Sequence, residues 1–196
     1  MSILALTSDT LIGTAAAGNI EYNGQFYGTD SAASRAQMQR ITQGTAVAST
    51  SGTSIDFTSF PAWVKKITVM FSGVSTNSTG VIQVQLGDSG GFEITGYAGQ
   101  TWQSNTSNAT LSTGFSFGTT SAATYIVHGS VVLTLIGSNL WTCFGILGRV
   151  TGADTIVTGG SKTLSDTLTQ VRVIASATGS PSDTFDAGSI NILYEG

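Results

Sequence analysis

The stretch Ile82-Gln-Val-Gln-Leu-Gly87 decides the fold class, because apolar and polar residues alternate along it without a break. Alternation with a period of two puts its three apolar side chains on one face of a β-strand and its glutamines on the other. The run Val64 to Val74 is a longer segment of the same kind. The pattern predicts a chain built of strands that each turn one face to a core.

Segments with strand character recur from residue 53 to the end of the chain. Besides the two above, strands are expected at residues 53–57, 92–98, 113–117, 126–137, 140–150, 168–175 and 187–195. Turn-forming residues separate them, at Ser72-Gly73, Gly87–Gly91, Ser138-Asn139, Gly159-Gly160 and Gly179–Ser182. Roughly eight to ten strands at this spacing predict an all-β sandwich, and the count fits a jelly roll.

The composition limits the classes of partner. Charged residues make up only 9% of the 196 residues and the net charge is −4, whereas soluble domains average about 25% charged residues. The seven Lys and Arg residues are scattered, so no basic stripe follows a phosphate backbone and nucleic-acid binding is not expected. The single cysteine, Cys143, lies in an apolar run and is predicted to be a core residue.

The chain carries no signal for secretion or membrane insertion. Its first residues lack the basic segment that precedes the apolar part of a secretory signal. No apolar stretch reaches the roughly 18 residues that a membrane helix needs. We therefore expect synthesis in a cytoplasm, without membrane insertion.

The first 48 residues differ in texture from the rest and contain one clear hairpin signal. Asn23-Gly24 lies between Ile20-Glu-Tyr22 and Phe26-Tyr27, and Asn-Gly favours the tight turn of a β-hairpin. An isolated hairpin is only marginally stable in water. Hence Ile20, Tyr22, Phe26 and Tyr27 are expected to bury against the main domain or against other copies of the chain, as an assembly interface.

A short helix is expected after this hairpin. Asp30 or Ser31 is a suitable N-cap for a helix over residues 32–41. The small-residue stretch from Gln43 to Gly52 then has the composition of a linker. The predicted organisation is an N-terminal anchor and oligomerisation segment, residues 1–48, followed by a β-sandwich domain, residues 49–196.

Several segments resemble a module of tailed-phage fibre and appendage proteins. The most specific are Trp63-Val-Lys-Lys-Ile-Thr-Val-Met-Phe71 and Asp186-Ala-Gly-Ser-Ile-Asn191, and residues 19–29 resemble a short element that precedes such modules. The resemblance covers most of residues 19–195. It implies a β-sandwich, a homotrimer and a place on the virion surface. Unlike long fibre proteins, this chain has no extended shaft, which favours a short spike or a capsid decoration protein.

No residue set in the sequence predicts catalysis, and no cofactor or metal is expected. His128 is the only histidine, and no Gly-x-Ser-x-Gly elbow accompanies it, so it is interpreted as a structural or surface residue. Asp88 and Glu93 flank a glycine-rich turn and could meet across a hairpin, as a glycosidase pair would. The favoured interpretation is that Asp88 shapes the turn through backbone N–H groups and that Glu93 is solvated.

Carbohydrate recognition is the remaining candidate chemistry. Tyr97 and Trp102 lie in a polar segment that is expected to form a long loop, and sugars bind aromatic faces that have polar groups beside them. The alternative is that both aromatics pack at the sandwich edge or a subunit interface. Trp63 and Trp141 lie in apolar contexts and are predicted to be core residues.

Together these observations predict a non-enzymatic structural protein of a phage particle. The first hypothesis is a trimeric short fibre or spike that contacts a host-surface glycan or protein. It would attach to other virion proteins through residues 1–45. The alternative is a capsid decoration protein that stabilises the particle without binding a host ligand. Both place the protein on the virion surface, and the sequence does not separate head from tail.

Overall fold

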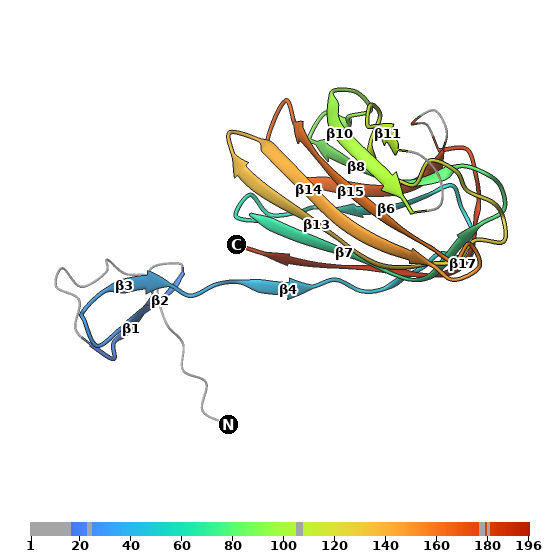
Figure 1. The fold of residues 1–196 in the computed structure, drawn as a ribbon. Helices are drawn as coiled ribbons and strands as arrows, with labels where there is room; N and C mark the ends of the chain where they lie inside the picture. The colour runs from blue at the N-terminus through green and yellow to red at the C-terminus, as the bar shows by residue number, and fades with distance from the viewer. Residues whose placement is uncertain (1–16, 23–24, 105–107, 177–178, 180) are drawn as a thin grey trace. The chain divides into compact units, whose positions relative to one another are not determined.

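The structure is a computed structural model that describes residues 17–22, 25–104, 108–176, 179 and 181–196. The chain divides into two compact units, residues 1–40 and 41–196, and each is described by itself. The described residues form seventeen strands and no helix (Figure 1), which confirms the all-β prediction. Accordingly, this part of the chain contains no helix long and apolar enough to cross a membrane.

The first unit is a small antiparallel sheet. It contains β1 (Ile20–Tyr22), β2 (Phe26–Thr29) and β3 (Arg35–Gln37), in that order across the sheet. The hairpin of β1 and β2 is the one that the sequence predicts. The predicted turn residues Asn23 and Gly24 lie outside the described residues.

The helix predicted for residues 32–41 is wrong. The Asp30 side chain does accept backbone hydrogen bonds, from the N–H groups of Ala32 and Ser34, both at 2.9 Å. These bonds close a tight turn, in which Ala33 has a φ of 57°. An aspartate that bonds the backbone just after it can favour a turn over a helix. The chain therefore reverses and continues as β3.

A nine-stranded antiparallel sheet dominates the second unit. Its strands are, in order, β11 (Asn108–Thr110), β10 (Tyr97–Gln103), β15 (Asp154–Thr163), β14 (Leu140–Arg149), β13 (Val127–Gly137), β7 (Lys66–Thr76), β17 (Phe185–Glu195) and β4 (Ile41–Gln43), and β5 (Val47–Ala48) pairs with β17. Four of the predicted strands are found here, as β7, β13, β14 and β17, with β13 and β14 within one residue of their expected limits.

A five-stranded sheet faces the large one. Its path is β12 (Phe115–Phe117), β8 (Val81–Asp88), β16 (Gln170–Ser176) and β6 (Ser54–Thr58), and β9 (Gly91–Phe92) pairs with β8. The stretch Ile82–Gly87 lies within β8, at the centre of this sheet. The segment expected as one strand at residues 92–98 instead divides between β9 and the start of β10.

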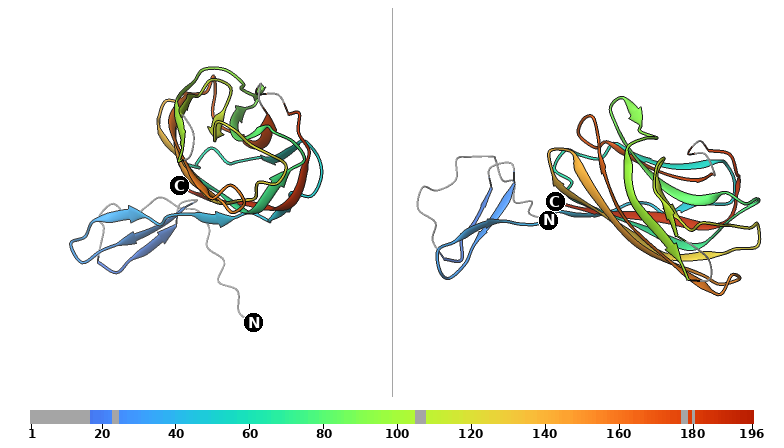
Figure 2. Two further views of the ribbon diagram at one scale, coloured as in Figure 1. Left: turned by 45° about the vertical axis from the view of Figure 1, so that its right-hand side comes forward. Right: turned by 45° about the horizontal axis from the view of Figure 1, so that its top comes forward.

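One hydrophobic core lies between the two sheets, whose strands face each other in Figure 2. Val69 and Leu133 of the large sheet and Val84 and Val173 of the small one are fully buried in it. The alternation read from the sequence thus turns the apolar face of most strands inward, but β8 is buried on both faces, with Gln83 and Gln85 also buried. The second unit has the β-sandwich arrangement of two packed antiparallel sheets.

Three strand pairs are nested in the topology. β7 pairs with β17, β8 pairs with β16, and β10 pairs with β15. Each pair therefore encloses the next one along the chain, and successive pairs lie in alternate sheets. The β13–β14 hairpin is inserted in the large sheet between β7 and β15.

The segment predicted as a linker is part of the large sheet. β4 and β5 both pair with β17, and the Gly44 N–H donates to the Ile192 carbonyl at 2.8 Å. The division between the units therefore follows Arg40, where the sequence placed it after residue 48. Small residues do not by themselves make a linker, because their backbone groups can still complete the edge of a sheet.

Two predicted turn signals have different outcomes. Ser138 and Asn139 both have positive φ, 46° and 63°, and form the predicted turn between β13 and β14. Gly159 and Gly160 do not form a turn but lie in the middle of β15. A Cβ on Gly160 would lie 2.7 Å from Leu111 Cδ1. The absence of a side chain at Gly160 therefore allows Leu111 to pack directly against the strand backbone. The glycine pair marks a close approach within a strand.

Candidate functional site

Tyr97 and Trp102 both lie on β10 but on opposite faces of it. Their separation of five residues is odd, and successive side chains of a strand point to opposite sides. Tyr97 is only 5% exposed, whereas Trp102 is 50% exposed. The prediction that both line one ligand surface on a long loop is therefore corrected: the segment is a strand, and only Trp102 is available to a ligand.

Tyr97 is a core residue with satisfied polar groups. Its ring packs edge-on against Phe115, with centroids 5.0 Å apart. Its hydroxyl donates to the Glu93 carbonyl at 3.0 Å and accepts the Leu86 N–H at 2.8 Å. Burial raises the pKa of the Tyr97 hydroxyl above its usual range. Tyr97 therefore joins the two sheets from within the core, whereas the alternative interpretation placed it at the sandwich edge or a subunit interface.

Trp102 stands on the outer face of the large sheet, in a row of apolar side chains. It lies opposite Val157 of β15, which in turn lies opposite Ile146 of β14. Ser104 follows directly on the last residue of β10. The Ser104 hydroxyl accepts the N–H of Thr155 at 3.1 Å. The next row of the sheet therefore begins with hydroxyl groups.

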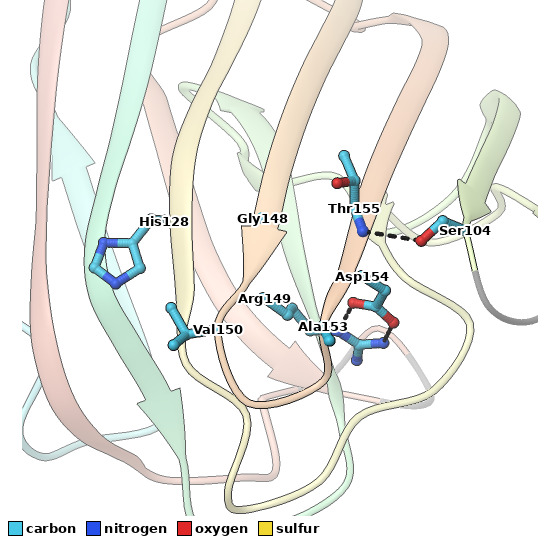
Figure 3. A pocket seen from close by; sticks show the side chains of 8 residues that line it. All are labelled: Ser104, His128, Gly148, Arg149, Val150, Ala153, Asp154 and Thr155. Carbon is cyan, nitrogen blue, oxygen red and sulfur yellow. Dashed lines mark hydrogen bonds and ion pairs between the residues drawn. The ribbon is translucent and has the colours of Figure 1, made fainter.

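An open groove of about 320 Å³ occupies this next row (Figure 3). We name it the His128 groove, and the residues that line it are Ser104, His128, Gly148, Arg149, Val150, Ala153, Asp154 and Thr155. His128 lies opposite Gly148, and Gly148 lies opposite Thr155, so the groove crosses four adjacent strands. The loop between β14 and β15, with Val150 and Ala153, closes one side.

His128 is fixed by a bond to the backbone. Its Nδ1 accepts the N–H of Gly73 at 3.2 Å. In the neutral ring the proton is then on Nε2, which is a hydrogen-bond donor. The structural or surface role predicted for His128 is consistent with this bond. The sequence did not show that the ring also borders a groove.

Gly148 forms the floor of the groove. A Cβ at this position would meet no atom within 4 Å, and the backbone here belongs to the regular strand β14. No close contact in the described structure therefore demands glycine at this position. Because Gly148 has no side chain, the space above the sheet at this position stays open.

A buried ion pair supports the groove from the inner side of the sheet. The Arg149 Nε donates to Asp154 Oδ1 at 2.6 Å, and Nη2 donates to Oδ2 (Figure 3). The remaining Arg149 nitrogen, Nη1, donates to the Thr120 carbonyl at 2.7 Å. The guanidinium also lies over the Tyr125 ring, 4.2 Å from its centroid. This arginine is fully engaged and is not a free cation for a ligand.

Gln103 extends the same network to the loop before β13. Its Nε2 donates to Asp154 Oδ2 at 2.9 Å, and its Oε1 accepts the Thr119 N–H at 3.1 Å. Gln103 and the ion pair together hold residues 118–120 against the ends of β14 and β15. Because Arg149 and Asp154 balance each other, the residues that line the groove carry no net charge apart from any on His128.

Asp88 has the structural role that the sequence favoured. Its Oδ1 accepts the Gly90 N–H at 2.8 Å within the turn, and its Oδ2 accepts the Ser165 hydroxyl at 2.6 Å and the Asp166 N–H at 2.9 Å. These bonds, led by the one from Ser165, lower the pKa of the Asp88 carboxyl. Asp88 thereby ties the β8–β9 turn to the loop before β16.

The solvated state predicted for Glu93 is wrong. Its carboxylate pairs with Lys162 and accepts the Ser165 N–H at 2.7 Å. The Ser165 hydroxyl oxygen lies 2.9 Å from Glu93 Oε1 and 2.6 Å from Asp88 Oδ2, so its single proton is shared between the two carboxylates. Burial by itself raises the pKa of Glu93, but the hydrogen bonds from Lys162 and Ser165 outweigh it and the pKa is lowered. Both carboxylates are engaged by protein donors, so they are not arranged as a glycosidase pair.

This cluster predicts a specific loss of stability in acid. A carboxyl group with a lowered pKa in the folded state stabilises the fold above its ordinary pKa, and the contribution disappears as the pH falls through the folded-state pKa. For Asp88 and Glu93 the ordinary values are 3.8 and 4.5. Ser165→Ala should lower the unfolding free energy at pH 7 by about 1–3 kcal/mol.

The difference between Ser165→Ala and the wild type should shrink steadily below about pH 4.5. Urea unfolding at a series of pH values measures it. Thr167→Ala, an exposed change in the same loop, is the control. A difference that stays constant down to pH 2 would contradict this role of the two carboxylates.

The predicted assembly residues are divided between the two faces of the N-terminal sheet. Ile20, Tyr22 and Phe26 share one face with Met38, whose N–H bonds to the Phe26 carbonyl at 2.9 Å. Ile20 is 67% exposed and Phe26 is 45% exposed. Tyr27 belongs to the other face, because it alternates with Phe26 along β2.

A hollow of about 450 Å³ opens on the apolar side of this sheet, bordered by Tyr22, Phe26 and Met38. On the opposite side, Glu21 lies across from Tyr27 and forms an ion pair with Arg35 at 3.1 Å. The two faces therefore differ sharply in polarity, and Tyr27 is removed from the predicted interface.

The remaining residues singled out in the sequence are mostly in the core. Trp141 and Cys143 are buried, as predicted. Burial raises the pKa of the Cys143 thiol. Trp63 is only partly buried and packs against Tyr194 with ring centroids 5.7 Å apart. None of these three residues borders the His128 groove.

The described residues contain no group of three or more His, Cys, Asp or Glu side chains placed to hold a metal ion. Comparisons with protein-family models, with curated proteins and with solved structures gave no match in any of the three. The function is therefore argued from the geometry of the chain itself.

Proposed function

We propose that this chain is a structural protein of a tailed-phage virion, a homotrimeric short fibre or spike that contacts the host surface. The sequence resemblance described above gives the virion setting. The observation that carries the assembly is the exposed apolar face of the N-terminal sheet, formed by Ile20, Tyr22, Phe26 and Met38.

This sheet is too small to bury its own apolar face. It has three strands of three or four residues, and a unit of this size needs further packing to be stable. Tyr22 and Phe26 already touch each other, with centroids 5.0 Å apart, so side chains on one face form a continuous patch. Association of three identical copies around an axis would bury their apolar patches against one another. Residues 1–45 would in addition attach the trimer to other virion proteins.

The sandwich topology supports the same proposal. Nested pairs of strands that alternate between two sheets are the pattern of a chain rolled up as one long hairpin, which is the basis of a jelly roll. We describe the domain as jelly-roll-like, with the β13–β14 hairpin as an insertion. The polar groups that could suggest catalysis, those of Asp88 and Glu93, are engaged in holding loops together.

We expect the protein in solution to have three times the mass of the 20.1 kDa chain, because it is proposed to be a homotrimer. Light scattering on the purified full chain measures it. Ile20→Lys should convert the trimer to monomers, because it places a charge on the apolar face of every copy. Gln37→Lys is the matched control, since it adds the same charge to the opposite face of the sheet. A monomeric wild type, or dissociation by both substitutions, would contradict the interface.

Capsid decoration is the second candidate. It is favoured by exposed apolar side chains on the outer face of the large sheet, Phe144 and Ile146 above all, which a neighbouring virion subunit could cover. Antibody labelling of particles in the electron microscope separates the two candidates. Label over the head supports decoration, and label confined to the tail supports the fibre or spike.

A further inference from the structure

We infer that the His128 groove and the neighbouring Trp102 form a binding site for an uncharged oligosaccharide of at least two sugar rings. The inference rests on the proposed function and names the ligand through which the protein would contact a host surface. It uses a strand face that the sequence did not assign to binding, and it leaves Tyr97 out of the site.

The size of the groove fits such a ligand. Its row of residues crosses from β10 to β13, which is three strand spacings, or roughly 14 Å. The volume of about 320 Å³ is at the lower end of the range for ligand sites. A single sugar ring would leave most of this length empty, whereas two linked rings would fill it.

The chemistry of the walls suits a sugar at both ends. Trp102 offers a half-exposed indole face, and apolar C–H faces of sugar rings pack on such surfaces. Trp102 stands in the row next to Ser104 and Thr155, one side-chain repeat or roughly 7 Å along the strands. A ring stacked on Trp102 is thus within reach of both hydroxyl groups.

His128 provides the polar contact at the other end. Because its Nδ1 is occupied by the Gly73 N–H, the neutral ring presents Nε2–H as a donor. A sugar hydroxyl is a suitable acceptor for it. The backbone bond also fixes the ring before a ligand arrives, which lowers the entropic cost of binding.

The charge of the site selects a neutral ligand. Arg149 and Asp154, the charged residues that border the groove, are paired with each other and turned to the interior. With the His128 ring neutral, an anionic ligand would find no available cation among the lining residues, and a cationic one no available carboxylate. Burying either charge without a partner is unfavourable, whereas hydroxyl groups can bond Ser104, Thr155 and His128.

Gly148 gives the sharpest test of the site. Gly148→Val should preserve the fold, because a Cβ at this position meets no atom within 4 Å and valine favours strands. It should nevertheless fill the groove. Gly159→Val is the matched control: Gly159 is also an exposed strand glycine of the same face, with nothing within 4 Å. It lies two rows from Gly148, in the row of Phe144.

The experiment uses the full chain on an array of neutral and acidic oligosaccharides, followed by isothermal titration calorimetry with each retained sugar. Calorimetry measures every variant on the same basis, including Trp102→Ala. The wild type and Gly159→Val should bind neutral members, and Gly148→Val and Trp102→Ala should each weaken binding at least about tenfold. His128→Ala should weaken it as well, while Ile136→Ala, an exposed change eight residues along β13, should not.

Each alternative result has a definite meaning. Binding of no neutral sugar, binding of acidic sugars alone, or binding that survives both Gly148→Val and Trp102→Ala would overturn the inference. The mass of the same sample is measured in parallel. A trimer that binds no sugar refutes this site and leaves the proposed assembly standing, whereas a monomer that binds through the groove refutes the assembly and leaves the site.

Discussion

Arg149→Met is expected to lower the free energy of unfolding by about 3–5 kcal/mol, because it leaves the buried Asp154 carboxylate without its partner. Both side chains are almost completely buried. The substitution removes two hydrogen bonds to Asp154 and the one to the Thr120 carbonyl. Met retains much of the apolar volume of the arginine side chain. The loss of unfolding free energy therefore comes mainly from the unpaired charge and the lost hydrogen bonds, and less from a cavity.

Two further variants make the Arg149 prediction specific. Arg149→Met combined with Asp154→Leu should recover part of the loss, since no unpaired charge is then buried. Arg172→Met removes an arginine from an exposed pair with Asp56, bonded at 2.8 Å through both nitrogens, and should cost about 1 kcal/mol or less. Urea unfolding of the four proteins checks the series. Equal losses from Arg149→Met and Arg172→Met would show that burial of the first pair is unimportant.

Phe115→Ala is the second substitution with a large expected effect, a loss of about 3–5 kcal/mol. The side chain is fully buried, in contact with Tyr97 at one edge and close to Gly160 at another, where its Cε1 would lie 3.4 Å from a Cβ. Removing the ring leaves a cavity between the two sheets that the glycine cannot fill. Tyr97, with its hydroxyl bonded on both sides, is not free to move into it.

Phe144→Ala is the matched control for Phe115→Ala. Phe144 lies on β14 with its ring 58% exposed on the outer face, so its removal from the monomer should change stability by no more than about 0.5 kcal/mol. Thermal and urea unfolding measure both variants. Comparable losses at the two positions would contradict the assignment of inner and outer faces.

The strands of the sandwich were largely predictable, because a strand with one buried face has apolar and polar residues in alternation along the sequence. β8, β13, β14 and β17 were all expected near their observed limits. β15 was missed because its central Gly159-Gly160 is, in the sequence alone, a turn signal. Whether a glycine pair bends the chain or admits a neighbour depends on Leu111 and Phe115, which are distant along the chain.

The candidate site was predictable only in part. The sequence singled out Trp102, whose binding role stays a prediction. Successive residues of a strand alternate between its two faces, so taking the segment as a strand would have separated Trp102 from Tyr97. The sequence could not show that His128, Gly148 and Thr155 lie side by side. They belong to three strands, and the register between strands cannot be read from any one segment. The N-terminal turn at Asp30 failed as a helix start for a related reason: the same aspartate caps a helix or closes a turn, and the local sequence allows both.

The sequence by itself determined the all-β class, the burial of one face of most strands, the neutral character of the surface and the hairpin of β1 and β2. These follow from composition and from periodicity, which are local properties of the chain. The tertiary structure alone decided which residues face each other: the Arg149–Asp154 pair beneath the groove, the engagement of Asp88 and Glu93, and the row from Ser104 to His128. The physical reason is register, since a shift of one residue between two strands would turn these side chains to the opposite face.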